Sequence, residues 1–194
     1  MTTIYFIRHA QSDRLSRDDA TRPLTDLGMS DTPKITAALK GKGIRHIISS
    51  PHMRALQTIS DLAKNLDIQV EVDKDFRERV VGNWIPDKFY GYIKQQWHDF
   101  NYRNEGGESL FEVQERCVAG IRRAMEQYRG ETIAIATHGT ALATIINRYY
   151  PDFGYQDVMR IIDYMPYVVR MDFANADTCA HREDVLIIER RYER

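Results

Sequence analysis

The fold class follows from one short segment in the second half of the chain, Ile133-Ala134-Ile135-Ala136-Thr137-His138-Gly139. Its first four residues are all apolar, which is typical of a strand that is covered on both faces of a sheet. The residues that follow, 140–149, predict a helix that ends near Pro151. A buried strand followed directly by a helix favours an α/β protein with a parallel sheet.

The segments on either side continue this alternation of strands and helices. Further strands are predicted at 4–7, 44–48, 68–72, 167–173 and 185–189, and further helices at 25–40, 54–66 and 109–128. The last of these helices opens on a capping box formed by Ser109 and Glu112. We therefore expect one domain over residues 1–194, an α/β three-layer sandwich. It has a mostly parallel central sheet with helices on both faces, and a small helical lid inserted at about 84–105.

Composition narrows the class of protein before any motif is considered. A hydrophobic fraction of 43% with 28% charged residues is that of a soluble globular protein. The net charge of -1 argues against a nucleic-acid-binding surface. No apolar run approaches the roughly 20 residues of a membrane span, and the N-terminal apolar run is too short for a signal peptide. We expect a cytoplasmic protein without a membrane partner, and the sequence leaves its oligomeric state open.

Polar side chains with catalytic potential collect where three predicted strands end. The first strand ends in Arg8 and His9, the second is followed by Arg54 one turn into its helix, and the buried strand ends in His138. In parallel sheets the ligand crevice lies beyond the carboxyl ends of the strands. Guanidinium groups match phosphate oxygens, and a neutral imidazole nitrogen can attack phosphorus. The pattern therefore predicts a phosphoryl-transfer site with a small phosphorylated substrate.

Six blocks along nearly the whole chain carry a family resemblance. They are Arg8-His9-Ala10-Gln11-Ser12, Pro23-Leu24-Thr25-Asp26-Leu27-Gly28, Ser49-Ser50-Pro51-His52-Met53-Arg54-Ala55-Leu56-Gln57-Thr58, Phe76-Arg77-Glu78-Arg79-Val80-Val81-Gly82-Asn83-Trp84, Gly106-Gly107-Glu108-Ser109 and Ala136-Thr137-His138-Gly139. In this order they resemble the histidine phosphatase superfamily, which includes the cofactor-dependent phosphoglycerate mutases.

The resemblance implies a role for each matching residue. His9 would carry the phosphoryl group as a phosphohistidine, and Glu78 would be the proton donor. The phosphate-binding residues that it implies are Arg8, Gln11, Ser12, Arg54, His138 and Gly139. Arg8, Arg54 and His138 thereby join His9 and Glu78 in the catalytic set.

The sequence also departs from the family's pattern. Leu15 stands where many members have an asparagine, and Pro86 stands where a glycine often follows the tryptophan. The predicted lid is rich in aromatic residues but offers only Lys88, Lys94 and Arg103 as cations. A mutase must hold a doubly charged phosphorylated acid, so a lid poor in cations favours a phosphatase.

Three functions follow from these observations, in decreasing order of support. The first is a metal-independent acid-type phosphomonoester phosphatase that uses no cofactor. We expect its pH optimum to be mildly acidic, because Glu78 has to carry a proton. The second is a phosphoglycerate mutase, and the third is a non-catalytic protein that binds a phosphorylated ligand. The six histidines show no metal-ligand spacing. Cys117 and Arg123 have the spacing of a cysteine phosphatase, but they lie within a predicted amphipathic helix, where we expect Cys117 to be a core residue.

Overall fold

The computed structural model describes residues 1–16, 18–83 and 89–191. Its strands are β1 (Thr2–Arg8), β2 (Ile44–Ser49), β3 (Val70–Val72), β4 (Thr132–Thr137), β5 (Tyr164–Asn175) and β6 (Thr178–Glu189). Within the described ranges they form one sheet of six strands in the order β3-β2-β4-β1-β5-β6. The first four strands in this order are parallel, whereas β5 runs antiparallel to both β1 and β6. The predicted α/β fold is confirmed as a mixed sheet in which the parallel part lies on one side.

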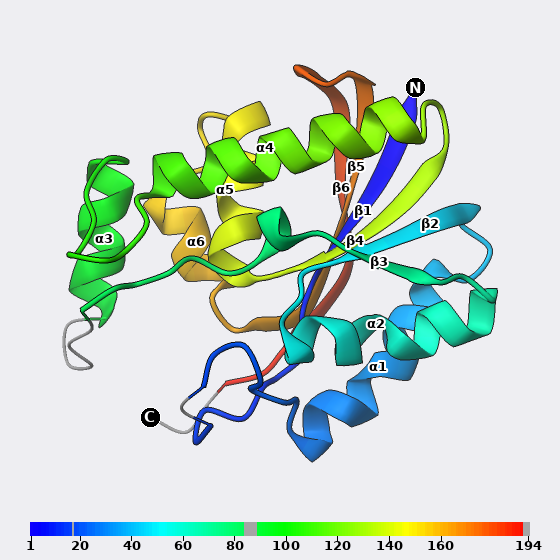
Figure 1. The fold of residues 1–194 in the computed structure, drawn as a ribbon, viewed down its shortest axis with the longest axis horizontal. Coiled ribbons are helices and arrows are strands. Elements are labelled where there is room, and N and C mark those ends of the chain that lie inside the picture. Colours follow the sequence, from blue (N-terminus) through cyan, green and yellow to red (C-terminus); the bar gives the residue numbers. More distant parts are fainter. Residues whose placement is uncertain (17, 84–88, 192–194) are drawn as a thin grey trace.

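Helices cover both faces of the sheet (Figure 1). The helices are α1 (Asp26–Leu39), α2 (Met53–Leu66), α3 (Phe89–His98), α4 (Leu110–Gln127), α5 (Gly139–Tyr149) and α6 (Tyr155–Ile161), with a short 3₁₀ helix η1 (Lys74–Phe76). The pair α1 and α2 packs on one face, and α4 and α5 pack on the other (Figure 1). The three-layer prediction is therefore confirmed.

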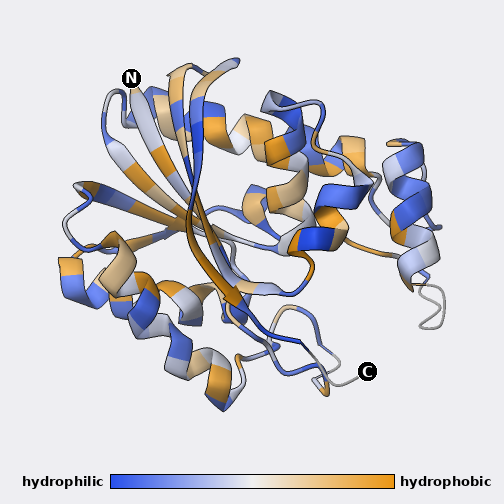
Figure 2. Cartoon of the chain, turned by 180° about the vertical axis from the view of Figure 1, so that it is seen from behind, coloured by the Kyte–Doolittle hydropathy of each residue, from blue (hydrophilic) through white to orange (hydrophobic). Residues whose placement is uncertain are grey.

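Strand β4 shows why the sheet needs cover on both sides. Ile133 and Ile135 belong to the core beneath α4 and α5, while Ala134 and Ala136 belong to the core beneath α1 and α2. All four side chains are fully buried, as the apolar run predicts. Figure 2 shows apolar residues concentrated in the central strands, with polar and apolar residues alternating along the helices.

Local signals in the sequence fix the ends of the main helices. Thr25 caps α1 by accepting a hydrogen bond from the amide of Gly28. Pro33 lies inside α1 and cannot donate to the carbonyl of Met29, but the hydroxyl of Thr32 donates to that carbonyl at 3.0 Å. The helix therefore continues through the proline without leaving that acceptor unpaired.

Helix α4 begins at the predicted capping box and carries the cysteine of the apparent cysteine-phosphatase spacing. Ser109 accepts from the amide of Glu112, whose carboxylate accepts from the amide of Ser109 in return. Cys117 is fully buried, and burial raises the pKa of its thiol to about 12. A thiol with such a pKa forms no thiolate near neutral pH, so Cys117 is a core residue.

The predicted lid corresponds in part to α3, which stands beside the body of the molecule (Figure 1). Residues 84–88, including Trp84, Pro86 and Lys88, lie outside the described residues. Helix α3 packs against α6, a short helix that the sequence did not predict. Within the described ranges, no helix combines the length and the apolar composition needed to cross a membrane.

Candidate active site

The ends of β1, β2 and β4 meet at one edge of the sheet, as predicted from their sequences. Because β4 pairs with β1 on one side and β2 on the other, the residues that follow these strands become neighbours. The amide of His9 donates to the carbonyl of Thr137 at 3.1 Å, and the amide of Ser50 donates to that of Ala136 at 2.9 Å. The backbone thus fixes the candidate nucleophile against the end of the central strand.

His9 is held in the tautomer that a nucleophile requires. Its Nδ1 lies 2.7 Å from the carbonyl oxygen of Ala10, which can only accept, so Nδ1 carries the proton. Its Nε2 accepts from Nε of Arg54 at 3.3 Å and therefore presents a lone pair. Burial lowers the pKa of His9 well below its usual value, and the charges of Arg54 and Arg8 lower it further. The ring is 7% exposed and is neutral near neutral pH.

The guanidinium of Arg8 lies next to the start of α5. Its Nη1 donates to the carbonyl of Ile161 at 2.8 Å, and its Nη2 donates to that of Ile162 at 2.9 Å. A Cβ at Gly139, the first residue of α5, would lie 3.1 Å from Cζ of Arg8. The glycine therefore lets a guanidinium approach a helix N-terminus, where backbone N–H groups favour an anion.

His138 lies behind His9 rather than on the surface of the cleft. It is fully buried, and its Nε2 lies 2.7 Å from the hydroxyl oxygen of Ser50. Its ring centre is 5.2 Å from that of His9 and 5.0 Å from that of His52. Burial lowers the pKa of His138 well below its usual value, with a further contribution from Arg54. The two predicted histidines are thus brought together, with the ring of His9 at the cleft and the ring of His138 buried next to it.

Glu78 reaches the same cleft from the segment that follows η1. One carboxylate oxygen accepts from the amide of Arg79 at 2.8 Å, and the other accepts from the amide of Thr140 at 3.1 Å. These two bonds hold the carboxylate at the N-terminus of α5, on the wall that also carries His9. Glu78, the expected proton donor, therefore lines the same cleft as His9, the expected nucleophile.

The remaining predicted phosphate contacts are placed differently from one another. Ser12 is buried and lines the cleft, whereas the side-chain oxygen of Gln11 accepts from the hydroxyl of Thr25 at 2.9 Å. Gln11 is not among the residues that line the cleft, since its side chain turns to the start of α1. Leu15, the departure from the family pattern, is 90% exposed and does not line the cleft either.

The cleft holds about 1300 Å³ and carries more positive charge than the sequence indicated. In addition to Arg8 and Arg54 it is lined by Arg14, Arg22, Arg77 and Arg79. Only the cations of the predicted lid were counted from the sequence. Arg22 directly precedes the block Pro23–Gly28, and Arg77 and Arg79 lie within the block Phe76–Trp84. Counting the basic residues within and next to each block would have found them.

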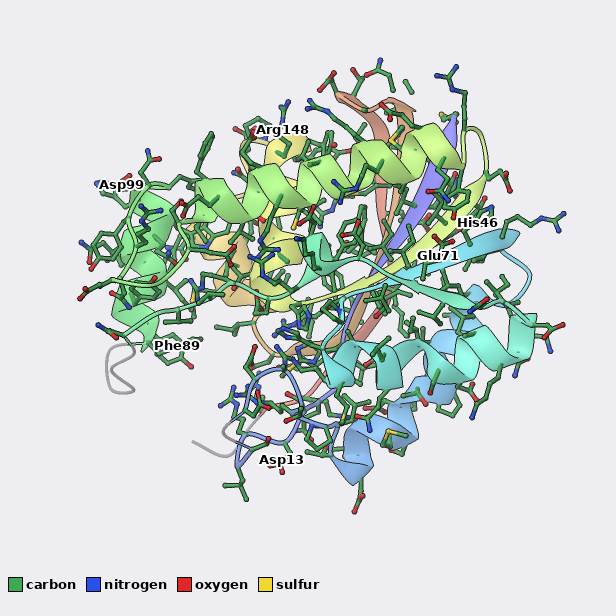
Figure 3. The ribbon with its side chains drawn as sticks, viewed as in Figure 1. Asp13, His46, Glu71, Phe89, Asp99 and Arg148 are labelled. Atoms are coloured by element: carbon green, nitrogen blue, oxygen red, sulfur yellow. The ribbon has the colours of Figure 1, made fainter. Side chains whose placement is uncertain are left out.

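The opposite side of the cleft is apolar. Helices α3 and α6 supply Phe89, Tyr90, Ile93, Trp97, Val158 and Ile161. Figure 3 labels Phe89 at the start of α3 and Asp13 in the loop after β1. His46 in β2 and Glu71 in β3, also labelled, lie on the side of the molecule away from α3 (Figure 3). Within residues 1–16, 18–83 and 89–191, no group of three or more histidine, cysteine or acidic side chains could hold a metal ion.

Comparison with known proteins gives one family and one fold. A model of the histidine phosphatase superfamily (branch 1) matches residues 4–165. Phosphoglycerate mutase-like protein 4 of Arabidopsis thaliana is 26% identical over 164 residues, which cover 76% of this chain and 71% of that protein. The structure of YhfR from Bacillus stearothermophilus superposes with a TM-score of 0.76 at 23% identity, covering 92% of this chain and 94% of its own. Phosphoserine phosphatase from Entamoeba histolytica, in complex with 3-phosphoglyceric acid, superposes with a TM-score of 0.75 at 20% identity, covering 94% and 96%.

Proposed function

The chain belongs to branch 1 of the histidine phosphatase superfamily, and from this premise we propose that it is a phosphomonoester hydrolase that works through a phosphohistidine on His9. The observation that carries the proposal is the state of the His9 ring. Its Nδ1 proton is bound to the carbonyl of Ala10, and its Nε2 lone pair faces Nε of Arg54. A neutral imidazole with a directed lone pair beside two guanidinium groups is suited to attack a phosphoryl group.

The proposed reaction has two steps. In the first, Nε2 of His9 forms a bond to phosphorus while the bond from phosphorus to the ester oxygen breaks, and Glu78 gives its proton to that oxygen. In the second, the Glu78 carboxylate takes a proton from water, whose oxygen bonds to phosphorus as the N–P bond breaks. Inorganic phosphate leaves, and both side chains return to their starting states.

Each remaining member of the site has a proposed part in this reaction. Arg8 and Arg54 neutralise the oxygens of the phosphoryl group, together with the backbone N–H groups at Gly139. His138 supports His9 from behind, and Ser12 contributes a hydroxyl from the cleft wall. No step in this scheme needs a metal ion.

A phosphoglycerate mutase is the second candidate, and two observations favour it. The Arabidopsis relative is named a phosphoglycerate mutase-like protein, and a Salmonella relative that is 24% identical is named a probable phosphoglycerate mutase. The cleft also has four arginines beyond Arg8 and Arg54. A mutase would return the phosphoryl group to the substrate instead of passing it to water. Free phosphate is therefore the product that separates the two candidates.

The test is a panel of phosphomonoesters incubated with the wild-type protein and with His9→Ala in parallel. We expect release of inorganic phosphate by the wild type, equal rates with and without EDTA, and a loss of about 10⁴-fold or more in His9→Ala. Incubation with 3-phosphoglycerate and a trace of bisphosphate primer should yield free phosphate. Isomer without free phosphate would replace the phosphatase with the mutase, and turnover by His9→Ala would contradict both.

A further inference from the structure

The loop between β1 and α1 places the carboxylate of Asp19 against the cations of the site. Asp19 Oδ1 lies 3.2 Å from Nη2 of Arg54 and 3.5 Å from Nη1 of Arg22. Its Oδ2 lies 3.3 Å from Nη2 of Arg54 and 3.4 Å from Nδ1 of His52. The backbone carbonyl of Asp19 also accepts from Nη1 of Arg54. The carboxylate of Asp19 therefore lies within 4 Å of three basic side chains that line the cleft, those of Arg22, His52 and Arg54.

These contacts engage Arg54 on every side of its guanidinium. Nε donates to Nε2 of His9, Nη1 donates to the backbone carbonyl of Asp19, and Nη2 donates to the carboxylate of Asp19. Arg54 is only 2% exposed, so water has little access to replace these partners. The result is a continuous chain of hydrogen bonds from the carbonyl of Ala10 through His9 and Arg54 to Asp19.

This chain is incompatible with a substrate in the reacting position. A phosphorus atom attacked by Nε2 of His9 must stand where the Nε–H of Arg54 now points. Its oxygens also require the Nη groups that Asp19 holds, because those are the donors a bidentate phosphate contact uses. Binding must therefore release Arg54 from Asp19 before the reaction can begin.

We propose that Asp19 is an internal competitor of the substrate phosphate and thereby determines the specificity of the site. Its carboxylate holds Arg54 over the lone pair of His9 until a ligand of greater negative charge displaces it. A phosphate dianion carries two charges against one and displaces Asp19, whereas singly charged ligands such as carboxylates do so poorly. This inference rests on the proposed function for its substrate, but the competition itself concerns only phosphate binding.

The test is Asp19→Asn, which keeps the size of the side chain and removes its charge. The matched control is Asp18→Asn, because Asp18 lines the same cleft but bonds the hydroxyl of Thr21 and the amide of Ala20. Relative to the wild type, Asp19→Asn should lower KM for p-nitrophenyl phosphate and Kd for inorganic phosphate by about 3- to 10-fold, with kcat within about twofold. Asp18→Asn should change both constants by less than about twofold.

A second readout follows the lone pair of His9 directly. Diethyl pyrocarbonate modifies unprotonated imidazoles, and trypsin separates His9, in peptide 9–14, from His52, in peptide 46–54. The modification rate of peptide 9–14 should rise in Asp19→Asn and stay at the wild-type value in Asp18→Asn. A residue that only stabilised the loop would not produce this difference between the two variants.

Two results would overturn the inference. One is equal phosphate affinity in Asp19→Asn and Asp18→Asn, and the other is a higher KM or a lower kcat in Asp19→Asn, which would make Asp19 a positioning residue for Arg54. Calorimetry with inorganic phosphate needs no turnover. If the wild type hydrolysed no phosphomonoester while Asp19→Asn still bound phosphate more tightly, the proposed function would fail and the competition would stand.

Discussion

The two walls of the cleft are built in different ways. The strand-end wall consists of Arg8, His9, Arg54, Glu78, Gly139 and Thr140. His9 is fixed by a backbone hydrogen bond to Thr137 at the end of β4, and the Glu78 carboxylate is held by the amides of Arg79 and Thr140. The helical wall consists of Tyr90, Ile93, Trp97, Val158 and Ile161, and it comes from α3 and α6, which contact each other. We infer that the first wall performs the proposed reaction and that the second contacts and selects the leaving group.

The largest expected effect tests whether Glu78 on the strand-end wall acts as the acid. Glu78→Gln keeps an acceptor for the amide of Thr140 or Arg79 but cannot give a proton. We expect kcat/KM for alkyl phosphates, which reports formation of the phosphohistidine, to fall by about 10²- to 10⁴-fold. For p-nitrophenyl phosphate the loss in kcat/KM should be much smaller, because p-nitrophenolate leaves without a proton. Equal losses in kcat/KM on both substrates would show that Glu78 does not protonate the leaving group.

The next effect tests the neutral state of the two buried histidines on this wall. Burial and neighbouring arginines hold the pKa values of His9 and His138 well below the usual 6.5. Below pH 6.5 the unfolded chain therefore binds protons that the folded protein does not, so stability falls as pH falls. We expect the free energy of unfolding to fall by up to about 1.4 kcal/mol per pH unit for each histidine.

Urea titrations between pH 7 and pH 5 measure this slope. In His138→Asn the slope should be about half as steep, because only one of the two histidines with a lowered pKa remains. A wild-type stability that stays constant or rises toward pH 5 would mean that these histidines are charged in the folded protein. His9 would then lack the lone pair on which the strand-end wall depends.

How far the sequence predicts each wall also differs. The apolar run of β4 and the residues at three strand ends were sufficient to place Arg8, His9, Arg54 and His138 together. Backbone geometry explains this, because parallel neighbours with apolar runs bring the residues that follow them to one edge. Strands at 167–173 and 185–189 were also predicted and lie within β5 and β6, but the alternation of strands and helices gave no sign of their antiparallel direction.

The directions of side chains in loops could not be predicted in the same way. Gln11 lies in the signature block, yet its side chain bonds Thr25 instead of facing the cleft. Asp19 and Arg22 belong to no regular element, and their contact with Arg54 depends on how the whole loop folds back. A side chain's direction in a loop is set by tertiary contacts that periodicity does not contain.

The third effect compares one glycine on each wall. Alanine in place of glycine within a helix usually stabilises it by about 0.5–1 kcal/mol. At Gly91 in α3 an added Cβ meets nothing within 4 Å, whereas at Gly139 it would lie 3.1 Å from Cζ of Arg8. We expect Gly91→Ala to raise Tm and keep kcat/KM.

Gly139→Ala should instead lower kcat/KM by about 10-fold with little change in Tm, because Arg8 must shift to make room. Thermal unfolding and kinetics on one substrate measure both variants. Full activity in Gly139→Ala would show that the reaction tolerates a shift of Arg8 by a few tenths of an ångström. The position of the Arg8 guanidinium would then matter less to the reaction than proposed.

The smallest effect tests the helical wall. Tyr90 lines the cleft on α3, and an aromatic ring stacked on a substrate contributes about 0.5–1.5 kcal/mol. Tyr90→Ala should therefore raise KM for p-nitrophenyl phosphate by about 2- to 10-fold and leave KM for glycerol phosphate unchanged. Phe111→Ala is the control, because Phe111 is similarly exposed but does not line the cleft. If the helical wall selects the leaving group, Tyr90→Ala should change only KM, and only for aromatic esters. A fall in kcat on both esters would mean that α3 helps to hold the reacting groups, and the division between the walls would not hold.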